Sequence, residues 1–416
     1  MTATIPASSA AGPWTPRVTL GLAVLAAAGF IYVTAEIMPV GALPAIAGDL
    51  GVSEAMVATL LASYALVAAL STVPLVRWTA HWPRRRTLLL TLTSLTASQL
   101  ISALAPTFAV LAAGRVLCAL THGLMWSVVA PIGARLVPAT HAARATTAVY
   151  VGTGFALVVG SPLTAALSQM WGWRLAVVAI TVAAAVVLVA ARFTLPPMAT
   201  TAVAPTGGAR RPWHHQNRRL VIMCALTLVG VTGHFISYAF IVVIISDIVG
   251  ISGPNLAWLL AGYGVCGLLA MGLLARPGDR RPKATIVACM AGLTAVFAVL
   301  AGLGFGHGSG VGTVIVGVVA ILGWGATATA VPPLLQTAAM RHSPEDPDGA
   351  SGLYVTAFQI GIMAGSLIGG LLFEHAGEPI MLTVSAVLIA SALVCVAAGR
   401  DLFGAPPTPV APAGDK

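Results

Sequence analysis

The sequence predicts an all-α membrane protein whose twelve transmembrane helices form two pseudo-symmetric six-helix bundles. Three observations support this fold class. First, 58% of the 416 residues are hydrophobic and only 8% are charged, whereas about 25% of the residues in a soluble domain are charged. Second, charged residues stand almost only where an apolar run of helical length ends. Third, a long loop separates two sets of six such runs.

A helix that crosses a hydrocarbon core of about 30 Å needs about 20 apolar residues. The first run is too long for a cleaved signal peptide, so it is expected to remain as a span. Between Ala284 and Met340 there is no Asp, Glu, Lys or Arg, but the glycine-rich segment 302–312 can turn the chain between two spans. The twelve predicted spans are residues 18–42, 55–76, 87–105, 107–134, 145–169, 173–193, 220–245, 254–275, 284–304, 311–338, 349–373 and 379–399.

The domain organisation follows from these spans. The linker contains a stretch rich in Pro, Thr and Ala, a composition typical of a flexible connection. The loop 82–87 after the second span resembles the loop 281–285 after the eighth, which indicates duplicated halves. Substrate sites of duplicated transporters lie between the repeats near the membrane midplane. The predicted segments are an N-terminal tail 1–17, an N-terminal bundle 18–193, a linker 194–219, a C-terminal bundle 220–400 and a C-terminal tail 401–416.

The distribution of Lys and Arg predicts the orientation in the membrane. Counted from a cytoplasmic N-terminus, 19 of these 21 residues fall on one side, and the exceptions are Arg115 within the fourth span and Arg174 in an outer turn. The positive-inside rule then places both tails and the linker in the cytoplasm of a multi-pass plasma-membrane protein. Orientation therefore explains the net charge of +9 better than nucleic-acid binding does.

Other features limit the possible partners. The five cysteines are odd in number and lie inside apolar runs, so packing is favoured over disulfides. The sequence has no phosphate-binding glycine loop with its lysine and no cluster of Cys and His with metal-ligand spacing. We expect a monomer that binds a small-molecule substrate, protons and the lipid bilayer, without a metal or cofactor.

Glu36 is the one Asp, Glu, Lys or Arg between residues 18 and 48. A charge at bilayer depth is costly, which makes this carboxylate a candidate for function. Helix rise places Glu36, eight residues inward from Pro44, and Arg115, eight residues past Thr107, both about 12 Å below the outer surface. The two are predicted either to pair and separate as protons bind or to lock two helices as a static ion pair.

Polar and aromatic side chains share helix faces in the fourth and seventh spans. Arg115, His122 and Trp126 recur at spacings of seven and four residues, so this face is predicted to line a polar cavity. Duplication places His234 and Tyr238 of the seventh span at the same cavity. The alternatives are ordinary packing and, for Gln359 in the eleventh span, an interhelical hydrogen bond. The predicted proton-coupling residues are Glu36 and Arg115, and the predicted substrate-binding residues are His122, Trp126, His234, Tyr238 and Gln359.

Glycines are concentrated in the fifth span, at Gly152, Gly154 and Gly160, and Pro162 follows them. Small residues let helices approach closely, and proline bends a helix. These four residues are predicted to serve helix packing, gating or both.

Several of these stretches resemble the major facilitator superfamily, and within it the drug:proton antiporter group that includes bacterial sugar-efflux and nucleoside-efflux exporters. The resemblance implies the major facilitator fold and associates Arg115 with proton transfer. It also matches Gly152, Gly154, Gly160 and Pro162 to the antiporter motif of the fifth span, although residues 163–165 replace the glycines that usually follow. The matching stretches lie in both halves, at residues 34–44, 114–127, 160–162, 172–174 and 233–238.

The cytoplasmic loop motif of this family is less complete here. Its usual Asp is Ala80, and after the second span only three arginines remain, so a charge-relay latch is not expected in the N-terminal half. The C-terminal half is expected to preserve it. The motif residues present are Arg84, Arg85, Arg86, Asp279, Arg280 and Lys283.

The predicted function is a proton-coupled efflux transporter that exports a small organic molecule by alternating access. Sugars, nucleosides and drugs such as chloramphenicol all remain candidate substrates. A proton-coupled importer of the same fold is the first alternative. A membrane-embedded enzyme or a non-transporting sensor is disfavoured, because the sequence shows no convergent set of nucleophile, base or metal ligands.

Overall fold

The computed structural model describes residues 14–198, 217–252, 254–306, 310–399 and 402–403. Most of the predicted tails and of the predicted linker lie outside these residues. The described chain is helical nearly throughout, and each predicted span coincides with one helix or with two or three consecutive ones.

Helices that precede the linker form the N-terminal group. They begin and end as follows: α1 Pro16–Gly41, α2 Leu43–Leu50, α3 Glu54–Trp78, α4 Arg84–Ala103, α5 Phe108–Arg135, the 3-10 helix η1 Ala139–His141, α6 Ala142–Phe155, the π-helix η2 Ala156–Gly160, α7 Ser161–Trp171 and α8 Trp173–Thr194.

Helices that follow the linker form the C-terminal group. They are α9 Arg218–Tyr238, α10 Ile241–Val243, the π-helix η4 Ile244–Val249, α11 Pro254–Arg280, α12 Pro282–Gly306, α13 Val311–Arg341, α14 Pro347–Ala376 and α15 Glu378–Ala398.

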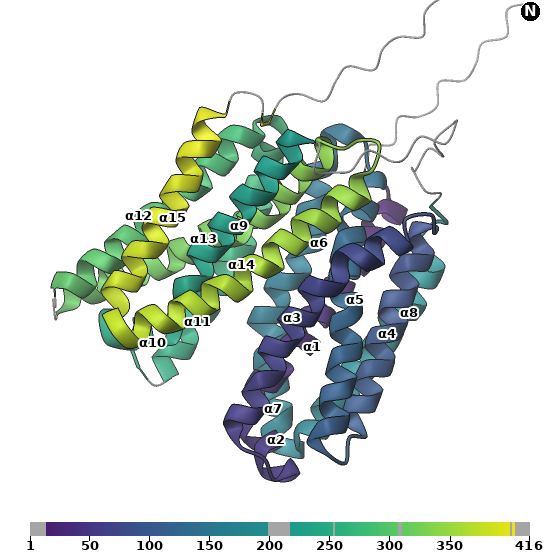
Figure 1. Ribbon diagram of the computed structural model, residues 1–416, viewed down its shortest axis with the longest axis horizontal. Helices are drawn as coiled ribbons and strands as arrows, with labels where there is room; N and C mark the ends of the chain where they lie inside the picture. The colour runs from purple at the N-terminus through teal and green to yellow at the C-terminus, as the bar shows by residue number, and fades with distance from the viewer. Residues whose placement is uncertain (1–13, 199–216, 253, 307–309, 400–401, 404–416) are drawn as a thin grey trace, which may run out of the picture.

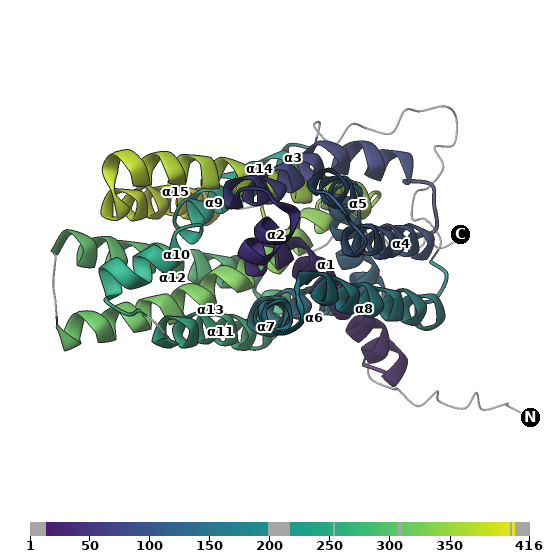
Figure 2. The same cartoon turned by 90° about the horizontal axis from the view of Figure 1, so that it is seen from below.

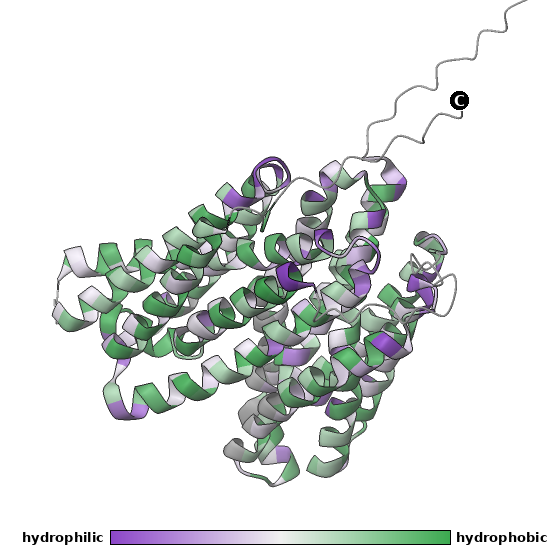
Figure 3. Cartoon of the chain, turned by 45° about the horizontal axis from the view of Figure 1, so that its top comes forward, coloured by the Kyte–Doolittle hydropathy of each residue, from purple (hydrophilic) through white to green (hydrophobic). Residues whose placement is uncertain are grey.

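Within the described residues, ten helical segments are long and apolar enough to cross a membrane. The predicted spans 55–76 and 87–105 form α3 and α4 but are not among these ten. In α4 the reason is composition, because the helix opens with three arginines and carries many Ser and Thr side chains. Hydrophobic residues cover the length of most helices, whereas hydrophilic ones gather at helix ends and loops (Figure 3).

The two groups meet along a few helices. In the N-terminal group α4 packs on α5 and α8, and α1 packs on α6 and α8; in the C-terminal group α9 packs on α14 and α15. Between the groups, α3 and α5 contact α14, and α6 contacts α11 and α13 (Figures 1 and 2). We call the side at which α1 and α4 begin the tail side. At the opposite side, α2 and α7 lie apart from α10 (Figure 1).

Proline interrupts the regular hydrogen bonding of the helices that line this junction. Pro39 lies inside α1, and Pro332 and Pro333 lie inside α13. In the fifth predicted span the regular helix gives way to η2, directly before the Ser161-Pro162 start of α7. Proline lacks an N–H donor, so each of these places leaves a carbonyl that can bond elsewhere. Helix breaks of this kind are frequent at functional sites.

Candidate functional site

A cavity of about 410 Å³ lies between the two groups of helices. Residues of α1, α5 and α6 line it from the N-terminal group, and residues of α9, α13 and α14 line it from the C-terminal group. Most of the lining is apolar. The predicted site residues at the cavity are Glu36, His122, Trp126, His234, Tyr238 and Gln359.

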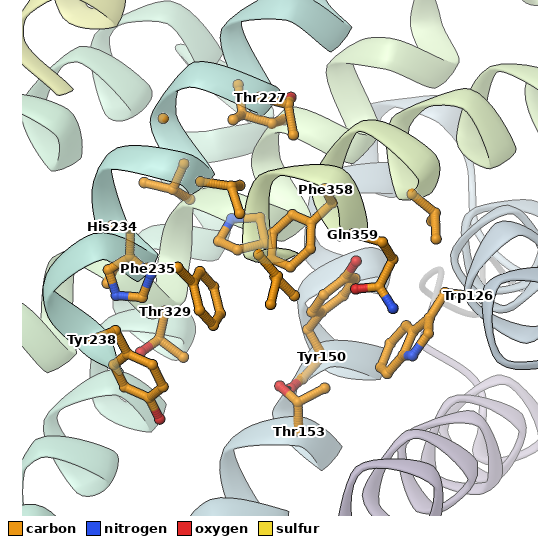
Figure 4. A pocket seen from close by; sticks show the side chains of 18 of the residues that line it. Trp126, Tyr150, Thr153, Thr227, His234, Phe235, Tyr238, Thr329, Phe358 and Gln359 are labelled. Carbon is orange, nitrogen blue, oxygen red and sulfur yellow. The ribbon is translucent and has the colours of Figure 1, made fainter. Parts of the chain in front are cut away.

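Figure 4 shows two ends of this cavity. His234, Phe235, Tyr238 and Thr329 lie together at one end, which the C-terminal group supplies. Trp126, Tyr150 and Thr153 of the N-terminal group lie at the other end. The amide of Gln359 reaches from α14 toward Trp126 and Tyr150, so an occupant of the cavity contacts both groups of helices.

The carboxylate of Glu36 faces His122. The Glu36 Oε2 and His122 Nε2 atoms are 4.0 Å apart, and their side chains are 21% and 4% exposed. The other imidazole nitrogen, Nδ1, lies 2.9 Å from the hydroxyl oxygen of Tyr64, a fully buried residue of α3. Tyr64 was not predicted from the sequence. Because its hydroxyl engages Nδ1, it fixes the edge of the imidazole that faces Glu36.

Arg115 does not form the predicted ion pair with Glu36, and it does not line the cavity. Its Nη1 donates to the backbone carbonyl of Ala35, and its Nη2 donates to the backbone carbonyl of Glu36 at 2.7 Å. Pro39 explains this arrangement: it has no N–H, so the carbonyl of Ala35, four residues earlier, loses its helical donor. The guanidinium also lies 4.8 Å from the centre of the Tyr64 ring. Arg115 thus lies level with Glu36 but binds the backbone of α1.

Aromatic rings surround His234 at the other end of the cavity. Its ring stacks on Tyr238 with centroids 5.1 Å apart and meets Trp324 edge to face at 5.9 Å. Among the described residues, His234 Nε2 and Gln359 Nε2 have no hydrogen-bond partner. A substrate with polar groups can satisfy such buried atoms, whose isolation otherwise costs free energy.

Asp348 at the start of α14 joins the two groups on the tail side. Its Oδ2 lies 2.6 Å from Nε of Arg84 at the start of α4, and 2.7 Å from Nη2 of Arg135 at the end of α5. Arg84 and Asp348 are buried. The loop motif of the N-terminal half, which has Ala80 in place of the usual Asp, thus pairs Arg84 with a carboxylate of the opposite group.

A second ion pair joins the groups nearby. Nε of Arg144 on α6 lies 2.6 Å from Oδ2 of Asp279 on α11, and the backbone N–H of Ala143 donates to Oδ1 at 2.8 Å. Asp279, a residue of the loop motif in the C-terminal half, thus binds the N-terminal group. Lys283 instead donates to the carbonyls of Ala397 and Gly399 at the end of α15.

The remaining residues of the loop motif lie elsewhere. Arg85 donates to the carbonyl of Leu195 at 3.0 Å, and the guanidinium of Arg86 lies 4.6 Å from the ring centre of Trp82. Arg280 is exposed. Of the predicted motif, only Arg84 and Asp279 take part in the ion pairs between the groups described here.

The glycines of the fifth span lie at close helix crossings. A Cβ at Gly152 would stand 1.9 Å from the carbonyl oxygen of Ala26 on α1, and one at Gly160 would stand 2.3 Å from Oγ1 of Thr34. At Gly154 it would meet Leu268 of α11, across the junction of the two groups, at 2.4 Å. Pro162 is the second residue of α7, and its side chain is outside the described part of the structure.

The family model of the Major Facilitator Superfamily matches residues 25–346 and 222–415. Chloramphenicol efflux pumps from two strains of Mycobacterium tuberculosis are 62% identical to this chain over 394 residues, which is 95% of this chain and 95% of each pump.

Solved structures share the fold at low sequence identity. The human organic anion transporter MFSD10 aligns with a TM-score of 0.74 at 16% identity, over 92% of this chain and 100% of that one. The Escherichia coli fucose:proton symporter aligns with a TM-score of 0.72 at 14% identity, over 90% and 97%. A bacterial homologue of the iron transporter ferroportin, in an outward-facing state, gives 0.69 at 15% identity, over 92% and 99%.

Proposed function

Because this chain belongs to the Major Facilitator Superfamily, we propose that it is a proton-coupled efflux transporter for chloramphenicol or a drug of similar chemistry. That it is a multi-pass membrane transporter follows from the family and the ten apolar helices. The position of Glu36 is the observation that supports proton-coupled drug efflux. Among the described lining residues it is the one carboxylate, and it faces an otherwise mostly apolar cavity between the two groups of helices.

The membrane orientation proposed from the distribution of Lys and Arg indicates which side of the protein the ion pairs close. If the tail side is cytoplasmic, Arg84, Arg144, Asp279 and Asp348 hold the two groups together on the cytoplasmic side. We infer that the arrangement closed by these pairs then corresponds to an outward-facing state of the transporter. Export requires these pairs to separate so that the cavity opens to the cytoplasm, and to close again when substrate leaves outward.

The chemistry of the cavity favours a drug over a sugar or a nucleoside. Chloramphenicol is uncharged and combines an aromatic ring with hydroxyl and amide groups. Its ring fits the aromatic end formed by Phe235 and Tyr238, and its polar groups can bond Gln359 and Glu36. A sugar would need polar partners around its whole circumference, and the mostly apolar lining supplies few. The volume lies in the range of ordinary small-molecule pockets, about 300–1,000 Å³.

Proton coupling is assigned to Glu36, with His122 beside it. Both side chains are shielded, and the 4.0 Å separation lets a proton on either group change the charge felt by the other. In the exchange we propose, a substrate that enters from the cytoplasm binds while Glu36 is unprotonated. A proton from outside then neutralises the carboxylate, weakens its bond to substrate hydroxyls and favours release outward.

Purified protein in liposomes tests this function. An outward-directed drug gradient should release protons into the compartment the drug leaves, and a proton gradient of the opposite direction should drive chloramphenicol uphill. Cells that lack their own pumps should become less susceptible when they express the protein. Absence of drug flux under a proton gradient would contradict the proposal, and flux of drug and protons in the same direction would identify an importer.

A further inference from the structure

We propose that Gln336 of α13 is a positioning residue that holds two substrate-facing aromatic residues, Trp126 and Tyr150, and ties them to the opposite half of the protein. Its role deepens the transport function proposed above and rests on it. Gln336 is fully buried. It directly follows Leu335, a residue of the cavity lining, on the way to the tail-side end of α13.

The amide of Gln336 makes three hydrogen bonds. Its Nε2 donates to the backbone carbonyl of Trp126 at 3.1 Å and to Oγ of Ser351 at 2.8 Å. Its Oε1 accepts from the hydroxyl of Tyr150 at 2.8 Å. The orientation of the amide follows from chemistry, because a carbonyl oxygen only accepts and must face the NH2 group. Both N–H donors and the carbonyl are therefore used.

Two of these bonds cross between the groups of helices. Trp126 lies on α5 and Tyr150 on α6, whereas Gln336 and Ser351 belong to the C-terminal group. The rings of Trp126 and Tyr150 contact each other with centroids 5.2 Å apart, and both line the cavity. The same two residues thus touch the substrate space on one side and the opposite group on the other.

Alternating access would break and re-form the hydrogen bonds of Gln336 to Trp126 and Tyr150. When the groups separate on the tail side, Trp126 and Tyr150 lose the bonds to Gln336, so their polar atoms must find water and their rings are free to move. Gln336 therefore contributes to closure of the tail side and keeps both rings in place while the cavity faces the other way. A neutral amide suits this position because it can separate without leaving a buried charge.

The experiment measures tail-side closure directly, without drug or protons. In a variant whose five native cysteines are replaced, Cys is placed at Ala143 and Gly278. A Cβ at Gly278 would lie 3.7 Å from that of Ala143 across the junction, within the roughly 3.5–4.5 Å that a disulfide requires. The Leu334 side chain at 2.3 Å must shift slightly to admit it. The rate of oxidative cross-linking then reports how often the tail side is closed.

In this background Gln336→Met should slow cross-linking about fivefold, the change that roughly 1 kcal/mol produces. Gln99→Met is the matched control: Gln99 is also fully buried, but neither polar atom of its side chain has a partner among the described residues. The control should cross-link at the unaltered rate. The apparent KM for chloramphenicol should rise in Gln336→Met and stay constant in Gln99→Met.

Tyr150→Phe removes a single hydroxyl and so preserves the fold even if Gln336→Met reaches the membrane poorly. It should slow cross-linking in the same direction, and the double variant should be no slower than Gln336→Met alone, because the two share one contact. Unchanged cross-linking in both single variants, or fully additive losses, would overturn the proposal. If cross-linking responds as expected but chloramphenicol is not transported, the substrate proposal fails and the role of Gln336 stands.

Discussion

Arg115 donates to the backbone carbonyl of Ala35, the group from which Pro39 removes the helical donor. Arg115 therefore completes the hydrogen bonding of α1 at Ala35, the residue directly before Glu36. The contact fixes the local path of α1 and with it the direction of the Glu36 side chain.

The loss of stability caused by replacing Arg115 should be partly reversed by replacing Pro39. Arg115→Met leaves the carbonyls of Ala35 and Glu36 without this donor and should cost about 1–3 kcal/mol of stability. Adding Pro39→Ala returns an N–H to Ala35 and should recover part of that loss. Thermal unfolding in detergent measures both variants. No recovery in the double variant would show that Pro39 does not explain the contact.

Glu36→Gln should leave the protein in the membrane but abolish proton-driven efflux, because the side chain keeps its shape and loses its charge. Substrate-induced proton release from liposomes is the measurement. Glu374→Gln, at an exposed position near the end of α14, is the control and should behave like the unaltered protein. Normal coupling in Glu36→Gln would remove this residue from the mechanism.

The two cavity histidines should respond differently. His234→Gln should raise the apparent KM for drug roughly 3–10-fold without moving the pH dependence of transport, since the imidazole packs against the rings of Tyr238 and Trp324 and lies at the end of the cavity opposite Trp126. His122→Gln should also move the pH dependence, because Nε2 lies 4.0 Å from the Glu36 carboxylate. Tyr64→Phe should reproduce that shift. Tyr32→Phe is the matched control, since its hydroxyl donates to the carbonyl of Thr91; equal pH profiles for all four variants would contradict the assignment.

Asp348→Asn should open the tail side. The substitution leaves the buried Arg84 without its countercharge, a change that costs about 3–5 kcal/mol when the site stays closed. The cross-link between cysteines at Ala143 and Gly278 should therefore form at least roughly tenfold more slowly. Asp247→Asn, at an exposed position of η4, should have no effect. Equal rates for the two variants would show that the Asp348 ion pairs do not hold the groups together.

The ion pair between Asp49 and Arg174 predicts a pH effect on stability. The hydrogen bond from Arg174 lowers the pKa of Asp49 below its ordinary value. A lowered folded pKa means that the carboxylate stabilises the fold above the unfolded pKa of about 3.9 and loses this effect as the pH falls through the folded value. The Tm difference between the unaltered protein and Asp49→Asn should be small, because both side chains are partly exposed, and should vanish on acidification. A difference that persists in strong acid would argue against this pair.

Much of the fold could be predicted from the sequence because bilayer thickness sets the length of an apolar run. The same reasoning gave the depth of Glu36 and Arg115 along their helices. It could not give the rotation of each helix about its axis, so the carbonyl contacts of Arg115 were not foreseen. The helical spacing of His122 and Trp126 predicted which helix face lines the cavity, and both residues lie there.

Residues whose role depends on packing between distant segments were missed. Asp348 and Arg84 stand 264 positions apart in the sequence, and a motif confined to one loop cannot reveal such a partner. Tyr64 is an ordinary aromatic residue in an apolar helix, and only its neighbours distinguish it. Gln336 offered a signal that could have been used: an amide in a run without any charge is costly unless it is bonded.

The ion pairs between the two groups also restrict which N-terminal and C-terminal halves can be combined in one protein. In those described here, the N-terminal half supplies only arginines and the C-terminal half supplies only aspartates. A chimaera that joins this C-terminal half to an N-terminal half with an acidic residue at the position of Ala80 would bring like charges near Asp348. A working pair of halves must therefore carry complementary charges at these positions.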